Sequence, residues 1–133
     1  MLLNVKKISL FIPVFLLVAA FAVQQGGPWK APDSADQKKN PLTADAANIA
    51  AGKALFLKEC ASCHGKKGKG DGPSSATLDV PAGNFASDAT QKQSDGALFW
   101  KTSVGRKPMP SFKKQFSETQ ILQLVIFMRT LKK

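Results

Sequence analysis

Residues 60–64 read Cys-Ala-Ser-Cys-His, and this window holds both cysteines and the only histidine of the 133-residue chain. Soft, metal-binding side chains are therefore confined to one short segment. Any cofactor or covalent link that depends on them has to form there. The chemistry of this window decides what the rest of the chain folds around.

Four kinds of site use such a window, and three of them suit it poorly. A disulfide between Cys60 and Cys63 would close a very short loop and stabilise little. A thioredoxin-like redox pair needs a neighbouring βαβ pattern, which the sequence lacks. A structural zinc ion needs four N or S ligands, one more than the chain offers. Covalent attachment of one c-type haem uses every residue, with thioethers from Cys60 and Cys63 and with His64 as the proximal iron ligand.

A haem bound through His64 leaves the sixth coordination site of the iron to be filled. No second histidine exists, so the candidates include three methionines. Met1 lies in the N-terminal leader, and Met128 stands among apolar residues of a predicted helix. Met109 lies between two prolines, which we expect to hold the backbone extended and to prevent a helix. Met109 is therefore the favoured axial ligand, with a lysine or an open site as alternatives.

Residues 1–22 have the features of a secretory signal peptide. Lys6 and Lys7 precede an apolar run over residues 8–23, and an Ala-Phe-Ala cleavage site ends at Ala22. The run is shorter than the roughly 20 residues that span a bilayer. We therefore favour cleavage over an uncleaved membrane anchor, which stays open as the alternative. In both cases the rest of the chain is expected to be exported to the periplasm.

Residues 23–40 are predicted to be a linker, and residues 41–133 to form the folded domain. The linker segment is rich in turn-forming residues such as Gly26, Gly27 and Pro28, and it lacks periodic apolar residues. Trp29 is the one residue of this segment that could pack on the domain. An exposed residue on a tether is the alternative.

The first helix of the domain is predicted to start at a cap on Thr43 or Asp45 and to end near residue 59. Gly52 lies inside it, where glycine costs about 1 kcal/mol relative to alanine. A close helix crossing on the face that Gly52 shares with Phe56 would explain this glycine.

Two more helices are expected, and little strand. One covers about residues 94–104, with Gly105 placed to end it. The other starts at a capping box on Ser117 and carries a broad apolar face. Between the first two helices, residues 65–93 are rich in Gly, Pro, Ser and Lys and predict a long ordered loop, which is typical of functional segments.

The sequence resembles the small class I cytochromes c over about residues 41–133. The resemblance rests on C-A-S-C-H-G at 60–65, G-D-G-P at 70–73, K-P-M-P-S-F at 107–112, the pair Gly52 and Phe56, and the apolar segment 124–131. It implies an all-α cytochrome c fold in which 3–5 helices wrap around one covalently bound haem, with the N- and C-terminal helices crossing.

The resemblance also implies positions for individual residues. Gly52 and Phe56 would lie at the helix crossing, facing Leu124 and Phe127. The carbonyl of Pro73 would accept a hydrogen bond from the free N–H of the proximal histidine, a bond that fixes the ring and tunes the iron. One departure is local, because Pro81 and Phe85 are one residue further apart than the usual Pro-x-x-Phe spacing.

Ligation by His64 and Met109 fills both axial sites and raises the reduction potential of haem iron. Such a protein is not expected to be an enzyme, since no site is left for a substrate. The main hypothesis is an exported one-electron carrier between redox partners. Two alternatives stay open: a membrane-tethered subunit through which electrons enter a larger oxidoreductase complex, and a haem ligand-binding enzyme or sensor with a labile Met109.

The chain has 19 basic and 9 acidic residues, a charge that bears on partners more than on the fold. We expect the cations around the haem motif and Met109 to steer redox proteins with acidic docking surfaces, although a solvated cationic surface is the alternative. Nucleic-acid binding is disfavoured by export. Membrane contact is expected only through an uncleaved N-terminus or a partner complex. These cations are Lys66, Lys67, Lys69, Arg106, Lys107, Lys113 and Lys114.

Overall fold

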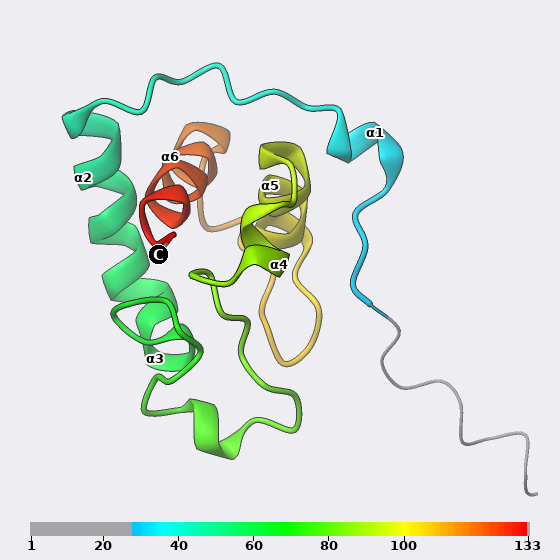
Figure 1. The fold of residues 1–133 in the computed structure, drawn as a ribbon, viewed down its shortest axis with the longest axis vertical. Coiled ribbons are helices and arrows are strands. Elements are labelled where there is room, and N and C mark those ends of the chain that lie inside the picture. The colour runs from blue at the N-terminus through cyan, green and yellow to red at the C-terminus, as the bar shows by residue number, and fades with distance from the viewer. Residues whose placement is uncertain (1–27, 133) are drawn as a thin grey trace, which may run out of the picture.

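The structure is a computed structural model that describes residues 28–132. The predicted signal peptide and the first part of the predicted linker lie outside the described residues. Within this range the chain is helical and has no strand, so the predicted all-α architecture is confirmed. Figure 1 shows the three longest helices, α2 (Ala46–Leu55), α5 (Asp95–Val104) and α6 (Glu118–Thr130), packed together. None of the helices within residues 28–132 has the length and apolarity needed to cross a membrane.

Helix α2 leads directly into the cysteine motif. Its cap is Asp45, whose Oδ1 accepts a hydrogen bond from the Asn48 N–H at 2.9 Å, so one of the two predicted caps is confirmed. The helical path then continues through a π-helical turn, η1 (Phe56–Cys60), and through α3 (Ala61–His64). It ends at Gly65, whose positive φ of 77° terminates the helix. The helical path is therefore longer than predicted, and it carries the whole Cys-Ala-Ser-Cys-His segment.

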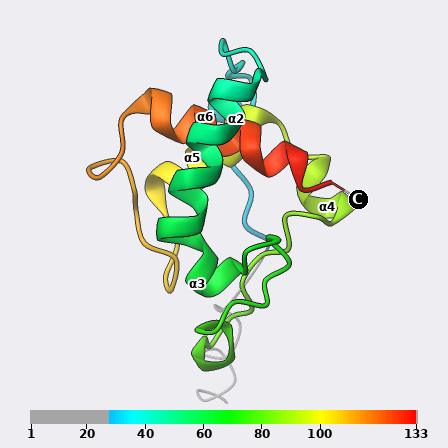
Figure 2. The ribbon, with the colours of Figure 1, turned by 90° about the vertical axis from the view of Figure 1, so that its left-hand side faces the viewer.

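Helices α2 and α6 cross, as Figure 2 shows from the side of α2, and Gly52 lies at their contact. A Cβ atom on Gly52 would lie 2.0 Å from the Gln123 carbonyl oxygen and 3.0 Å from the Phe127 Cβ, so only glycine permits this approach. The ring of Phe56 is fully buried and lies 5.2 Å from the ring of Phe127. Leu124 is also fully buried in the same core cluster. The predicted crossing is confirmed.

Helix α6 begins as its sequence predicts. The Ser117 hydroxyl accepts from the Gln120 N–H at 3.2 Å, and the Ser117 N–H donates to the Gln120 side chain at 2.9 Å. Near the other end, the Arg129 guanidinium donates to Asp95 at 2.7 and 2.8 Å and to the Gln93 carbonyl at 2.6 Å. These bonds tie α6 to the start of α5, and the apolar face of α6 between them is buried in the core.

The loop that follows the motif contains two short helices that the sequence did not predict. The 3-10 helix η2 covers Ser75–Thr77, and α4 covers Asp88–Gln91. Helix α4 is a single turn, too short to show an apolar periodicity, and its only local signal is the cap at Ser87.

Residues 28–40, which the sequence predicts to be part of a linker, pack against α5 and α6. This segment, called the N-terminal strap below, contains the one-turn helix α1 (Asp33–Asp36). The Ser94 hydroxyl donates to Asp36 at 2.6 Å, and Lys38 forms an ion pair with Glu118 at 2.7 Å. The linker boundary therefore has to be corrected for residues 28–40. The contacts join positions far apart in the sequence, which local composition does not reveal.

Candidate functional site

An apolar cavity of about 260 Å³ opens between α3, α5, α6 and the loops that connect them. Four of the five predicted site residues line it: Cys60, Cys63, His64 and Met109. The fifth, Pro73, lies elsewhere. The structure therefore brings the sequence-predicted residues of both the cysteine motif and the methionine loop to one space.

The two cysteines lie on the helical side of the cavity. Cys60 ends the π-helical turn and is 8% exposed, while Cys63 is half-buried one turn later. Both are free thiols. Burial raises the pKa of Cys60 to about 12, and the neighbouring Glu59 and Cys63 add to the effect, so this thiol is protonated at neutral pH. Single π-helical turns are common at functional sites, but no pattern in the sequence predicted this one.

His64 is oriented by a backbone hydrogen bond. Its Nδ1–H donates to the Gly83 carbonyl at 2.9 Å, which leaves Nε2 as the nitrogen that can bind iron. Its ring centroid lies 4.6 Å from that of Phe85. Burial lowers the pKa of His64, and the bond to Gly83 acts in the opposite direction. Burial thus favours the neutral imidazole, the form that binds a metal.

The acceptor of this bond differs from the expectation that the Pro73 carbonyl would hold the histidine. Pro73 is exposed, and the backbone around it bonds to the outer side of the motif, where Gly72 N–H donates to the Cys63 carbonyl at 3.1 Å. Gly83 reaches His64 because the Phe85 N–H donates to the Gly68 carbonyl at 2.7 Å and holds this segment against the ring. The extra residue before Phe85 is accommodated, since that side chain is buried.

Met109 lies on a turn at the opposite side of the site, where it is half-buried. The backbone does not run extended through the two prolines as expected. It reverses at residues 107–108, and the Met109 N–H donates to the Arg106 carbonyl at 2.9 Å. The ends of the loop approach each other at Gly105, which has a φ of +67° and where a Cβ would lie 2.4 Å from the Pro110 carbonyl oxygen.

Met128 also lines the cavity, from helix α6. It is 2% exposed and belongs to the core cluster, as the apolar pattern of the helix predicted. The site thus offers two thioether sulfurs, one on a loop and one in the core.

Several cavity residues were not identified as site residues from the sequence. Lys101, Arg106 and Lys107 contribute cations to the lining, and Trp29 reaches it from the N-terminal strap. Burial lowers the pKa of Lys101, nearby Arg106 lowers it further, and Asp36 acts in the opposite direction. The isolated tryptophan was the only sequence signal for this part of the wall.

Residues 49–132 match the family described as Cytochrome c. The chain belongs to the cytochrome c family. No curated protein matches the sequence.

Solved structures of other proteins share the fold of this cytochrome c. The Kuenenia stuttgartiensis reducing HAO-like protein complex Kustc0457/Kustc0458 matches with a TM-score of 0.62 and 29% identity, over 70% of this chain and 47% of that one. The KustC0563 c-type cytochrome matches with a TM-score of 0.54 and 28% identity, over 62% of this chain and 98% of that one. Cytochrome CL from the marine methylotrophic bacterium Methylophaga aminisulfidivorans MPT matches with a TM-score of 0.52 and 25% identity, over 66% of this chain and 55% of that one. The chain thus spans about half the length of the first of these.

The cofactor of this family is a covalently bound haem c with its iron, and the residues of the cavity fit it. Two free thiols in the C-x-x-C-H spacing line the same apolar space as a histidine whose second nitrogen is already bonded. Cationic side chains at the lining suit the carboxylates of haem. The cavity therefore carries the residues with which a cytochrome c domain holds its haem.

Proposed function

We propose that this cytochrome c is an exported one-electron carrier whose haem iron is bound by His64 and Met109. One observation carries the proposal: both side chains line one apolar cavity together with Cys60 and Cys63. The bound haem supplies a one-electron iron couple, and His/Met ligation raises its reduction potential.

Each of these residues has a distinct task in the proposed carrier. Cys60 and Cys63 would hold the cofactor through thioethers, so the haem could not dissociate from the exported protein. The Gly83 carbonyl holds the His64 ring in one tautomer, which raises the basicity of the ligand. The apolar lining excludes water, and a filled sixth site leaves no place for a substrate, so the protein would have no substrate chemistry of its own.

The proposed partners are redox proteins with acidic docking surfaces. All seven cations that flank the haem motif and the Met109 loop are exposed in the structure. Exposed charges of one sign raise the rate of encounter with an oppositely charged partner, and salt reduces the effect. The association rate with an acidic partner protein should therefore fall steeply as ionic strength rises. A rate that is independent of salt would exclude this steering.

Redox-monitored visible spectroscopy of the exported holoprotein tests the proposal. We expect a one-electron titration, a ferric sulfur-to-iron charge-transfer band at neutral pH, and no rapid binding of CO or cyanide. Rapid binding of these ligands would instead favour the alternative of a haem enzyme or sensor with a labile methionine.

A second candidate is a tethered subunit through which electrons enter a larger complex. It is favoured by the similarity to a Kuenenia stuttgartiensis protein that is part of a reducing HAO-like complex. Fractionation separates the two candidates. Release by osmotic shock with an N-terminus at Val23 supports the mobile periplasmic carrier, whereas membrane retention with an intact N-terminus supports the tethered subunit.

A further inference from the structure

The N-terminal strap is held on the domain by contacts along its length. Its helix α1 lies so close to α5 that a Cβ on Gly96 would approach the Ala35 carbonyl oxygen to 1.9 Å. The Lys38 ammonium lies 4.5 Å from the centre of the Phe99 ring, and the Asn40 side chain donates to the Leu122 carbonyl at 3.2 Å. Only glycine at position 96 of α5 leaves room for the Ala35 backbone, so α5 is suited to a strap that is packed against it. These contacts indicate a fixed position for the strap.

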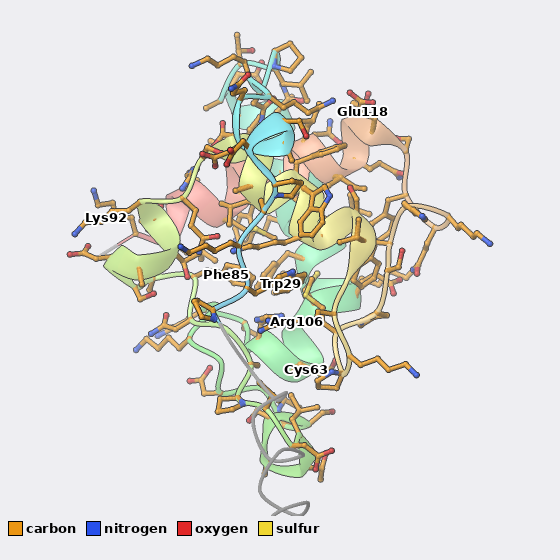
Figure 3. All side chains as sticks on the ribbon, turned by 90° about the vertical axis from the view of Figure 1, so that its right-hand side faces the viewer. Trp29, Cys63, Phe85, Lys92, Arg106 and Glu118 are labelled. Atoms are coloured by element: carbon orange, nitrogen blue, oxygen red, sulfur yellow. The ribbon has the colours of Figure 1, made fainter. Side chains whose placement is uncertain are left out.

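The strap places Trp29 over the haem cavity. The indole centroid lies 6.4 Å from that of Trp100, and the Arg106 guanidinium lies 4.9 Å from the Trp29 ring. The Lys101 ammonium lies 5.6 Å from the same ring. Figure 3 shows Trp29 and Arg106 on the face that also carries Cys63. Two cation–π contacts and one aromatic contact thus fix an otherwise isolated residue.

Trp29 also forms part of the cavity wall that contains Cys63, His64 and Met109. We propose that Trp29 is a haem-contacting residue, and that the strap sets the reduction potential by covering the haem with this side chain. The proposal rests on haem binding in this cavity, but not on which methionine is the sixth ligand.

The physical basis is the cost of charge in an apolar site. Ferric haem carries one more positive charge than ferrous haem, and water stabilises the more charged form. The apolar shell around a metal controls solvent access and thereby the potential. Removal of the indole would admit water to the cavity, favour the ferric state and lower the midpoint potential.

The test compares midpoint potentials of the full-length holoprotein, four single variants and one double variant. Trp29→Ala removes the covering side chain, whereas Trp29→Phe keeps an apolar ring there. Gly96→Ala displaces the strap, and Trp29 with it, through its clash with Ala35, and it changes the identity of no residue of the cavity wall. Lys30→Ala changes an exposed strap residue outside the cavity wall and serves as the control.

We expect Trp29→Ala and Gly96→Ala to lower the potential and to speed reduction by a small neutral reductant. Trp29→Phe should have a potential close to that of the wild type, and Lys30→Ala should have the wild-type potential. The double variant Trp29→Ala/Gly96→Ala should shift no further than Trp29→Ala alone, because both changes remove the same cover.

A Trp29→Ala holoprotein with the wild-type potential would overturn the proposal. An equally large shift of the potential in Lys30→Ala would also overturn the proposal, because the change in potential would then come from the charge of the strap and not from the cover by Trp29. The sulfur-to-iron band is recorded for each variant beside the wild type. A wild type without the band would refute the His64/Met109 ligation and leave the comparison of potentials intact.

Discussion

The two sides of the haem cavity are built in different ways. On the histidine side, the loop after the motif bonds back to the motif itself: the Gly70 N–H donates to the His64 carbonyl at 2.8 Å and the Ser74 N–H to the Ser62 carbonyl at 2.8 Å. On the methionine side, the loop is attached to α5 near its end, through the Phe112 N–H and the Thr102 carbonyl at 3.3 Å. Met109 lies on a turn where its N–H donates to the Arg106 carbonyl.

This difference separates a rigid attachment site from a ligand on a loop. Backbone bonds and left-handed glycines fix the position of His64, so substitutions there should affect folding and haem attachment. The Met109 turn is exposed on both flanks, since Pro108 and Pro110 are exposed. Changes at Met109 should therefore alter the spectrum and the potential more than the stability.

The largest effect is expected for Cys63→Ser on the attachment side. This change removes one of the two sulfurs that can form a thioether, so the cell should yield a single-thioether product or no holoprotein. Mass spectrometry and haem staining after denaturing electrophoresis measure this. Ser62→Ala, an exposed position between the two cysteines, is the matched control and should retain full attachment. Full retention of haem with two thioethers in Cys63→Ser would contradict the assignment.

Gly72→Ala should have a smaller effect, on stability. Its Cβ would lie 2.3 Å from the Ser62 carbonyl oxygen and 2.6 Å from that of Ala61, and these are backbone atoms of the motif. We expect a loss of about 1–3 kcal/mol in the free energy of unfolding, measured by denaturant titration.

Gly83→Ala is the matched control for this substitution. The nearest atom to the new Cβ would be the His64 Cε1 at 3.9 Å, and the φ of Gly83 is not in the left-handed region, so the free energy of unfolding should change by no more than about 0.5 kcal/mol. If Gly72→Ala and Gly83→Ala lowered the free energy of unfolding equally, the loop would not be more tightly packed at Gly72 than at Gly83.

The smallest effect is expected at Asp45, remote from the cavity. The Asn48 backbone N–H and then the Thr43 hydroxyl hold the pKa of Asp45 below its usual value of 3.8. Because the folded state favours the carboxylate, its stabilising effect is complete above the unfolded pKa and is lost as pH falls through the lower folded pKa. Denaturant titrations at several pH values measure the free energy of unfolding of the wild type and of Asp45→Ala. The difference between the two should become smaller as the pH falls below 3.8. A difference that does not change with pH would refute the claim that the charge of the Asp45 carboxylate stabilises the helix.

Much of the fold could be predicted because its signals are local. The caps at Asp45 and Ser117 and the terminating Gly105 act within a few residues, so the starts of the three long helices and the end of α5 were predicted close to where they are observed. Gly52 is an exception, since its reason lies on α6, but a glycine inside an apolar helix face already indicates a close approach.

The site was predicted in part for the same reason. Cys60, Cys63 and His64 form one contiguous motif, and the scarcity of other possible iron ligands favoured Met109. The Gly83 acceptor and the contact of Trp29 could not be predicted, because each depends on a contact between distant segments. Trp29, for example, is placed by a strap whose approach depends on Gly96.

The central claim, that His64 and Met109 bind the haem iron, is tested most directly by two parallel substitutions. Met109→Leu and Met128→Leu each remove one of the two thioether sulfurs at the cavity and keep a similar side-chain volume. The visible spectrum of the ferric holoprotein at neutral pH is then recorded. We predict that Met109→Leu loses the sulfur-to-iron band while Met128→Leu keeps it. A band that survives in Met109→Leu would contradict this ligation.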